Sequence, residues 1–212
     1  MKEVNKGKGT SIHLFLLLLV TAIFIWSMIK PTGGYLTWAM EVGPAVVGLI
    51  IAIATYNKFR LTTLSYIIIA ILAIIMFVGG HYTYSRVPLF NWLKDVYDLK
   101  RNHYDRFGHL IKGLIVIVIR EILLRKTPLT TGAWLFTIVT SISLALAALY
   151  EIIEWLVSVI TKGGKASKDF LGNQGDIWDS QWDMSFALIG SILALLLFSK
   201  LHNRLMKKEL ND

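Results

Sequence analysis

Apolar blocks long enough to cross a lipid bilayer recur along the whole chain, and they constrain the fold more than any other feature. A membrane helix needs about 20 predominantly apolar residues, and only helices and closed barrels satisfy their backbone polar groups in lipid. The spacing predicts an all-α polytopic membrane protein, a bundle of six transmembrane helices. We expect them at residues 13–29, 35–55, 61–80, 106–124, 132–160 and 177–200 of a single integral membrane domain, 1–212.

The first apolar block, residues 13–29, follows a basic segment, as the apolar part of a signal peptide does. A cleavage site with small residues should then come next. The chain instead continues with Lys30-Pro31-Thr32-Gly33-Gly34. We therefore expect a retained first helix.

The charge distribution predicts how the bundle is oriented. The net charge is +8, which in a soluble protein would indicate a nucleic-acid partner. Here the basic residues lie in short segments between apolar blocks, so they are interpreted as topology signals and contacts with the lipid bilayer, and no nucleic acid is expected. Loops 81–105 and 161–183 also carry many aspartates. The prediction is N-in/C-in, with these two loops outside. The chain has no cysteine, which excludes disulfides and thiolate ligands.

Ionisable residues gather where five of the six predicted helices approach the outer boundary. They are Glu41, His81, Asp105, His109, Lys112, Glu151, Glu154, Asp176, Asp179 and Asp183. Such residues are costly in a membrane and need a reason. At helical spacing the three aspartates share one stripe with Ala187 and Gly190, and Asp105 shares a face with His109. Small residues let helices approach closely, so we expect the carboxylates to converge.

Converging carboxylates and histidines form a ligand set for a divalent metal such as Zn²⁺, Mn²⁺ or Mg²⁺. In the first hypothesis the metal ligands are Asp105, His109, Glu151, Asp179 and Asp183. His81 or Glu154 acts as the catalytic base. The substrate would be a lipid-linked or phosphorylated envelope compound, and the metal would polarise a phosphoryl oxygen or activate water. No established metal motif is complete.

The alternative is a non-catalytic membrane scaffold whose acidic and histidine layer is a structural polar network. The acids would then pair with Arg86, Arg101, Arg106 and Lys112. A small permease is the weaker form of this alternative, because only Pro44 suggests a broken helix. Some residues are interpreted as lacking a function. These are the Glu121–Arg125 pair, which would contribute little if exposed, His13 and His202 as interfacial or surface residues, and His103 as a loop residue.

Four segments together resemble the YjdF-like family of bacterial inner-membrane proteins. They are His81-Tyr82-Thr83-Tyr84, Arg101 to His109, Tyr150-Glu151-xx-Glu154-Trp155, and Gly172-Asn173-Gln174-Gly175-Asp176-xx-Asp179-xx-Trp182-Asp183. The resemblance covers about residues 35 to 200. It implies a multi-pass protein of the inner (plasma) membrane and brings no activity with it.

More remotely, the chain is similar to the VanZ-like membrane proteins, which are linked to glycopeptide tolerance. Asp105, His109, Glu151 and the aspartates before Gly190 match their pattern. The chain departs from it at Glu154, where a Gln is expected, and at Asp183, where an Asn is expected. The similarity is at the level of the fold and favours envelope chemistry.

Overall fold

The computed structural model describes residues 3–164 and 169–210, and every regular element in these two ranges is a helix. Five helices are long and apolar enough to cross a membrane: Gly9–Ser27, Tyr35–Thr55, Thr63–Tyr82, Ala133–Ile160 and Asp179–Glu209. They belong to α1 (Glu3–Ser27), α2 (Tyr35–Thr55), α3 (Thr63–Tyr82), α7 (Ala133–Ile160) and α9 (Asp179–Leu210). The prediction of an all-α membrane bundle is confirmed.

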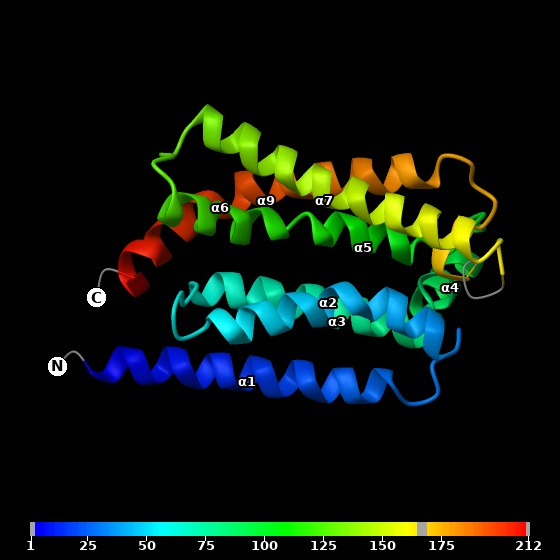
Figure 1. Cartoon of the computed structure of the whole chain (residues 1–212), viewed down its shortest axis with the longest axis horizontal. Helices are drawn as coiled ribbons and strands as arrows, with labels where there is room; N and C mark the ends of the chain where they lie inside the picture. The colour runs from blue at the N-terminus through cyan, green and yellow to red at the C-terminus, as the bar shows by residue number, and fades with distance from the viewer. Residues whose placement is uncertain (1–2, 165–168, 211–212) are drawn as a thin grey trace.

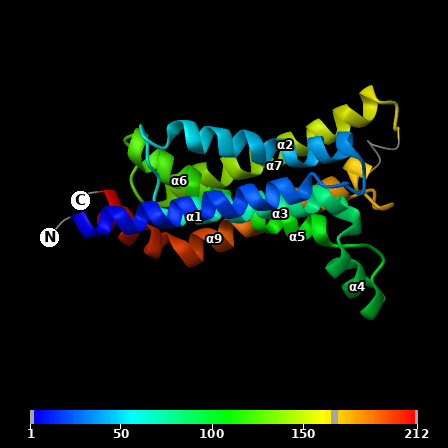
Figure 2. The same cartoon turned by 90° about the horizontal axis from the view of Figure 1, so that it is seen from below.

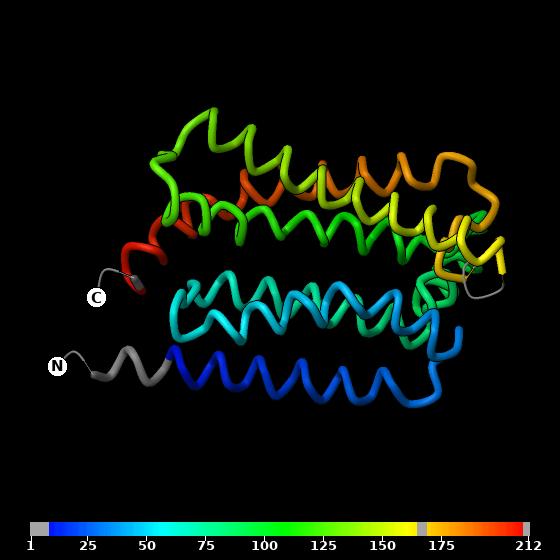
Figure 3. Tube along the Cα trace, in the orientation of Figure 1, coloured from blue at the N-terminus to red at the C-terminus, as the bar shows by residue number. Residues whose placement is uncertain are grey.

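The helix expected at residues 106–124 is divided into α5 (Tyr104–Lys112) and α6 (Ile115–Lys126). Gly113 and Leu114 separate the two parts. Across this join the Leu114 amide donates to the Ile111 carbonyl at 2.9 Å, and the Val116 amide donates to the Gly113 carbonyl at 3.2 Å. These bonds reach three residues back, so the join is a tightened helical turn. The two helices therefore run end to end (Figure 3).

The helices form two groups that share α3. One apolar core joins α1, α2 and α3 around Val20, Val42 and Phe77. The other joins α3, α6, α7 and α9 around Ile117 and Val139. α1 begins and α9 ends at the same end of the bundle, here named the termini end, and the opposite end is named the site end (Figure 1).

The segment expected to be a loop at residues 81–105 contains two further helices, so that prediction is wrong for part of its length. They are η1 (Tyr84–Arg86) and α4 (Pro88–Val96). Proline at the first helical position favours a helix start, because the missing N–H costs nothing there. Leu89, Trp92 and Val96 leave more than half of their surface exposed. α4 extends away from the bundle at the site end (Figure 2).

The polar tail after residue 200 continues α9 to Leu210, whereas the sequence predicts an end near Lys200. Contacts with other helices hold this extension. Arg120 of α6 contacts His202 and donates to Asn203, and Glu209 accepts from the Thr63 amide at 2.8 Å. His202 is consequently fully buried, and the prediction that it lies at the surface or interface is wrong.

Candidate functional site

A glycine contact between α5–α6 and α9 brings the predicted site residues together. A Cβ atom at Gly190 would collide with the Leu110 carbonyl oxygen. One at Gly113 would lie 2.5 Å from the backbone nitrogen of Ser191. Only glycine allows two backbones to approach so closely. The acidic start of α9 is thereby pressed against the polar face of α5.

Asp105, His109 and Asp183 meet above this contact. Each offers one metal-ligating atom, and the three atoms lie within 4.8 Å of one another. Asp105 and His109 are one helical turn apart on α5, and their Oδ1 and Nε2 atoms are 3.6 Å apart. Glu151 of α7 places its Oε1 atom 3.6 Å from the same Nε2 atom. We call these four buried residues the acid–histidine cluster.

Three buried polar atoms of the acid–histidine cluster have no hydrogen-bond partner among the described residues. They are Nδ1 of His109, Oε1 of Glu151 and Oδ1 of Asp183. A buried polar atom without a partner is rare in native proteins and calls for an explanation such as an ion or a water molecule. The cluster therefore has free coordination capacity.

Lys112 borders the cluster on the same helix. Its Nζ atom lies 3.1 Å from Nε2 of His109 and stands over the rings of Tyr84, at 5.2 Å, and Tyr150, at 4.4 Å. No carboxylate of the described residues lies within ion-pairing distance of it. The helical spacing predicts Lys112 on this face. It does not predict the two tyrosines, because they come from distant parts of the chain.

Asp179, predicted as a metal ligand, lies in a separate layer of ion pairs that we call the arginine–aspartate layer. Arg101 donates a hydrogen bond to Asp179, and Arg106 donates one to Asp176. The Trp178 amide also donates to Asp176, and with Arg106 it holds the pKa of that carboxyl below its usual value. This layer covers the acid–histidine cluster toward the site end and matches the alternative reading, in which arginines neutralise the acids.

A reciprocal pair of hydrogen bonds fixes the loop that carries these aspartates. The Asn102 amide donates to Oε1 of Gln174 at 2.9 Å, and Nε2 of Gln174 donates to the Asn102 carbonyl at 2.9 Å. Gly172 and Gly175 take positive φ angles of 58° and 86°, which glycine adopts without steric cost. Two of the segments that carry the YjdF-like resemblance are thus joined in space.

The two residues predicted as catalytic bases occupy different places. His81 lies against α1, with its ring 4.2 Å from that of Trp26 and its Nδ1 atom 3.4 Å from the Ser27 carbonyl. Glu154 is buried one helical turn beyond Glu151 on α7. The structure therefore places Glu154 beside the acid–histidine cluster and directs His81 toward α1.

A second buried cluster lies toward the termini end, where the sequence predicts only an exposed ion pair. Glu121 has no exposed surface and accepts hydrogen bonds from Arg125 at 2.7 Å, from Ser65 at 2.6 Å and from the amide and hydroxyl of Thr62. Nε2 of His202 lies 3.2 Å from its Oε2 atom. We call this group the Glu121 cluster. Its partners are about 60 to 80 residues away in the chain, so no local spacing predicts them.

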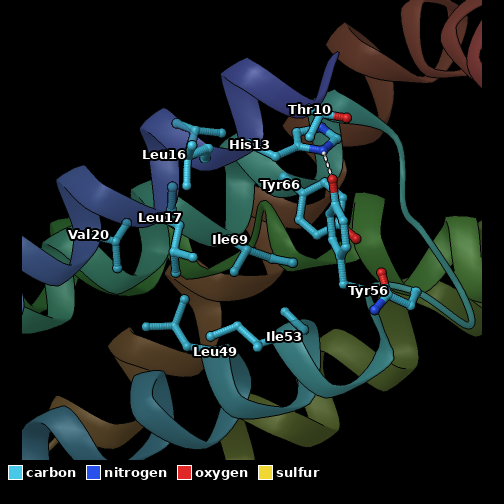
Figure 4. A pocket seen from close by; sticks show the side chains of 14 residues that line it. Thr10, His13, Leu16, Leu17, Val20, Leu49, Ile53, Tyr56, Tyr66 and Ile69 are labelled. Atoms are coloured by element: carbon cyan, nitrogen blue, oxygen red, sulfur yellow. Dashed lines mark hydrogen bonds between the residues drawn. The ribbon is translucent and has the colours of Figure 1, made fainter. Parts of the chain in front are cut away.

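A cavity of about 350 Å³ between α1, α2 and α3 lies apart from both clusters (Figure 4). His13 borders its polar edge and is hydrogen-bonded to the Tyr56 hydroxyl at 2.9 Å and to Thr63 at 3.2 Å. The walls are leucine and isoleucine side chains, such as Leu17 and Ile53. His13 is buried, so the prediction of a surface or interfacial residue is wrong. The ring has partners for both nitrogens, which fits a structural role.

Comparison with known proteins agrees with the apolar helices. A family model described as "Predicted membrane protein (DUF2238)" matches residues 12–204. The chain is 38% identical over 192 residues to the inner membrane protein YjdF of Escherichia coli (strain K12), and the alignment covers 90% of each chain. No solved structure matches the chain. The predicted resemblance to the YjdF-like family is confirmed, and so is a multi-pass protein of the inner membrane.

Proposed function

Because the chain belongs to the DUF2238 family of membrane proteins, we propose that its acid–histidine cluster binds one divalent metal ion. The site acts on a lipid-linked or phosphorylated compound of the cell envelope. One observation carries the proposal: ligand atoms of Asp105, His109 and Asp183 lie within 4.8 Å of one another. The atoms left without a partner on Asp183 and Glu151 support it, because a metal ion would satisfy them.

The donor set fits zinc, manganese or magnesium. Carboxylate oxygen and imidazole nitrogen are ligands for all three, with oxygen-rich sets favouring the harder ions. Asp105, His109 and Asp183 are the three ligands. Glu151 is the fourth, or it remains free to accept a proton. Asp179 is left out of this set because Arg101 binds it.

The metal, when bound, would polarise a phosphoryl oxygen of the substrate. Glu151 is placed to accept the proton of an attacking water molecule, and Glu154 is the second candidate for this role on the same face of α7. Lys112 supplies a positive charge on the side away from the carboxylates of α9. The arginine–aspartate layer closes the site toward the aqueous end and orients the start of α9.

The site faces outside if the predicted topology holds. α5 and α6 together, Tyr104 to Lys126, are about 34 Å long, enough to cross a hydrocarbon core of about 30 Å. Counting them as one crossing gives six, which fits the beginning of α1 and the end of α9 at one end of the bundle (Figure 1). The positive-inside rule then favours N-in/C-in.

The competing proposal is a structural polar network without chemistry. It is favoured by the contact between Lys112 and His109, which supplies a cation where a metal would otherwise be needed. A permease is less well supported, because the apolar core around Ile117 and Val139 separates the acid–histidine cluster from the Glu121 cluster. Metal content decides between the two main proposals.

The test is metal analysis of the full-length protein purified in detergent. The protein is stripped with a chelator, reloaded with Zn²⁺, Mn²⁺ or Mg²⁺ in turn, and assayed by mass spectrometry of the metals. We expect one ion per chain, and loss of that ion in His109→Ala and in Asp183→Asn.

Asp179→Asn is the matched control, because it removes an aspartate of the same helix turn without touching the three ligands. It should keep the metal. A folded wild-type protein that takes up none of the three ions would overturn the proposal and leave the structural network.

A further inference from the structure

A long apolar groove leads from the acid–histidine cluster toward the termini end. Its volume is about 790 Å³, and its walls are α2 and α7, with α3, α5 and α6 beneath. α2 and α7 lie along the same face of the bundle (Figure 2). His109 and Lys112 border one end of the groove, and Thr55 and Lys126 border the other. The groove therefore connects the proposed metal site with the lipid phase.

We propose that this groove holds one hydrocarbon chain of an anionic membrane lipid, whose phosphate binds beside Lys112 at the metal site. This names the substrate class of the proposed function and rests on it. The bound cation is needed to offset the neighbouring carboxylates.

The length of the groove fits the chain of a lipid from one leaflet. On α2 the lining extends from Pro44 to Thr55, which corresponds to about 16 Å of helix. One leaflet supplies half of a hydrocarbon core of about 30 Å. Lining residues such as Val47, Ile51 and Leu146 leave much of their surface exposed, so the groove opens sideways to lipid.

The charges at its two ends decide the direction of the lipid. Lys112 is half-buried, and none of the described carboxylates pairs with it. A phosphate would supply the missing anion in a region where water cannot. Lys126 is exposed and rests against the Phe59 ring, so water can hydrate it. The phosphate therefore belongs at the Lys112 end and the chain terminus at the Lys126 end.

Gly48 offers a clean way to close the groove. It lines the groove on α2, and a Cβ atom added there meets no heavy atom within 4 Å. Gly48→Phe should fill the groove without straining the bundle. Gly43, one helical turn and a residue earlier, is equally open but does not line the groove. Gly43→Phe is the matched control.

The experiment uses full-length, metal-loaded protein in phosphatidylcholine nanodiscs. The probe is a long-chain alkyl phosphate with a diazirine near the chain terminus, and the comparison probe is the corresponding alkyl alcohol. After irradiation, labelled residues are mapped by mass spectrometry. We expect the phosphate probe to label the Thr55 and Lys126 end, and Gly48→Phe to abolish this labelling while Gly43→Phe keeps it.

The phosphate should matter as well as the chain. Lys112→Gln should reduce labelling by the phosphate probe about fivefold, and the alcohol should label no better than that variant does. Excess inorganic phosphate should not compete, because most of the binding comes from the chain.

Equal labelling by the two probes, labelling that survives Gly48→Phe, or labelling at the His109 end would overturn the inference and indicate an ordinary boundary lipid. If the metal binds but the groove is not labelled, the lipid inference fails and the proposed metal site stands. If no metal binds and groove labelling still depends on Lys112, the metal site fails and the lipid groove stands.

Discussion

Two buried clusters in the same bundle combine carboxylates with a histidine, yet they differ in how their polar atoms are satisfied. Glu121 accepts hydrogen bonds from Thr62, Ser65 and Arg125 and has His202 beside it. The acid–histidine cluster leaves Nδ1 of His109, Oε1 of Glu151 and Oδ1 of Asp183 without partners among the described residues. Burial of a carboxylate in a membrane bundle is therefore a poor guide to function on its own.

The difference teaches where to look for a ligand. A fully connected polar network rigidifies the bundle and locks helices in register. A partly connected one costs free energy unless something outside the chain completes it. The acid–histidine cluster has the second character, and the four predictions below test this distinction.

The largest effect should follow from Glu121→Ala. Removing one member of a connected buried network leaves its donors unpaired, so we expect a loss of about 3–5 kcal/mol in the free energy of unfolding. Asp183→Asn in chelator-treated protein should change stability much less, because no donor loses its acceptor. Denaturant unfolding in detergent micelles measures both. Equal losses in the two variants would show that the clusters do not differ.

A smaller effect is expected from Gly190→Ala. The added methyl group would collide with the Leu110 carbonyl and should cost about 1–3 kcal/mol by overpacking. Separation of α5 from α9 should also move Asp183 away from His109 and abolish metal uptake. Gly43→Ala, with open space around the new Cβ atom, is the control for stability and metal content. Unchanged metal uptake in Gly190→Ala would contradict the role given to this contact.

Lys112→Met should strengthen metal binding. A positive charge next to the cluster opposes a cation by at least about 1 kcal/mol, which corresponds to about fivefold in affinity. The increase should appear in a competition titration between protein and a chelating dye. If metal affinity falls, Lys112 belongs to the binding site in another way, and the cluster is closer to a completed network than we propose.

The smallest effect concerns the pH dependence of the arginine–aspartate layer. The folded-state pKa of Asp176 is lowered by the Trp178 amide and Arg106. Its stabilising contribution is therefore present above the unfolded pKa of about 3.9 and is lost as the pH falls through the folded value. Asp176→Asn should remove this small acid-dependent component in unfolding measured from pH 7 to pH 3. An unchanged pH profile would contradict the ion pair.

Much of the candidate site could be predicted because its signals are local. Asp105 and His109 are one turn apart on α5, and Asp183 shares a small-residue stripe with Gly190 on α9. Helical spacing makes such pairs visible in the sequence. The assignment of Asp179 was less secure, because the same stripe could not tell which aspartate Arg101 would bind.

Other features depend on contacts between distant segments and were therefore hidden. Glu121 and His202 meet only after the bundle has formed, and α4 has too few residues for a strong periodic signal. The division between α5 and α6 results from the close approach of Gly113 to Ser191, which no single helix sequence encodes. Membrane location needed only the lengths of apolar blocks.

α9 carries a member of each cluster, Asp183 near one end and His202 near the other, about 28 Å apart along the helix. A helix is stiff along its axis, so the depth of Asp183 is set from the far side of the bilayer. Glu121 and Arg120 grip the distal end of this rod, while Gly190 fixes its rotation against α5. Sliding by a single turn would dismantle both clusters at once, so the inert anchor acts as the alignment gauge for the reactive one.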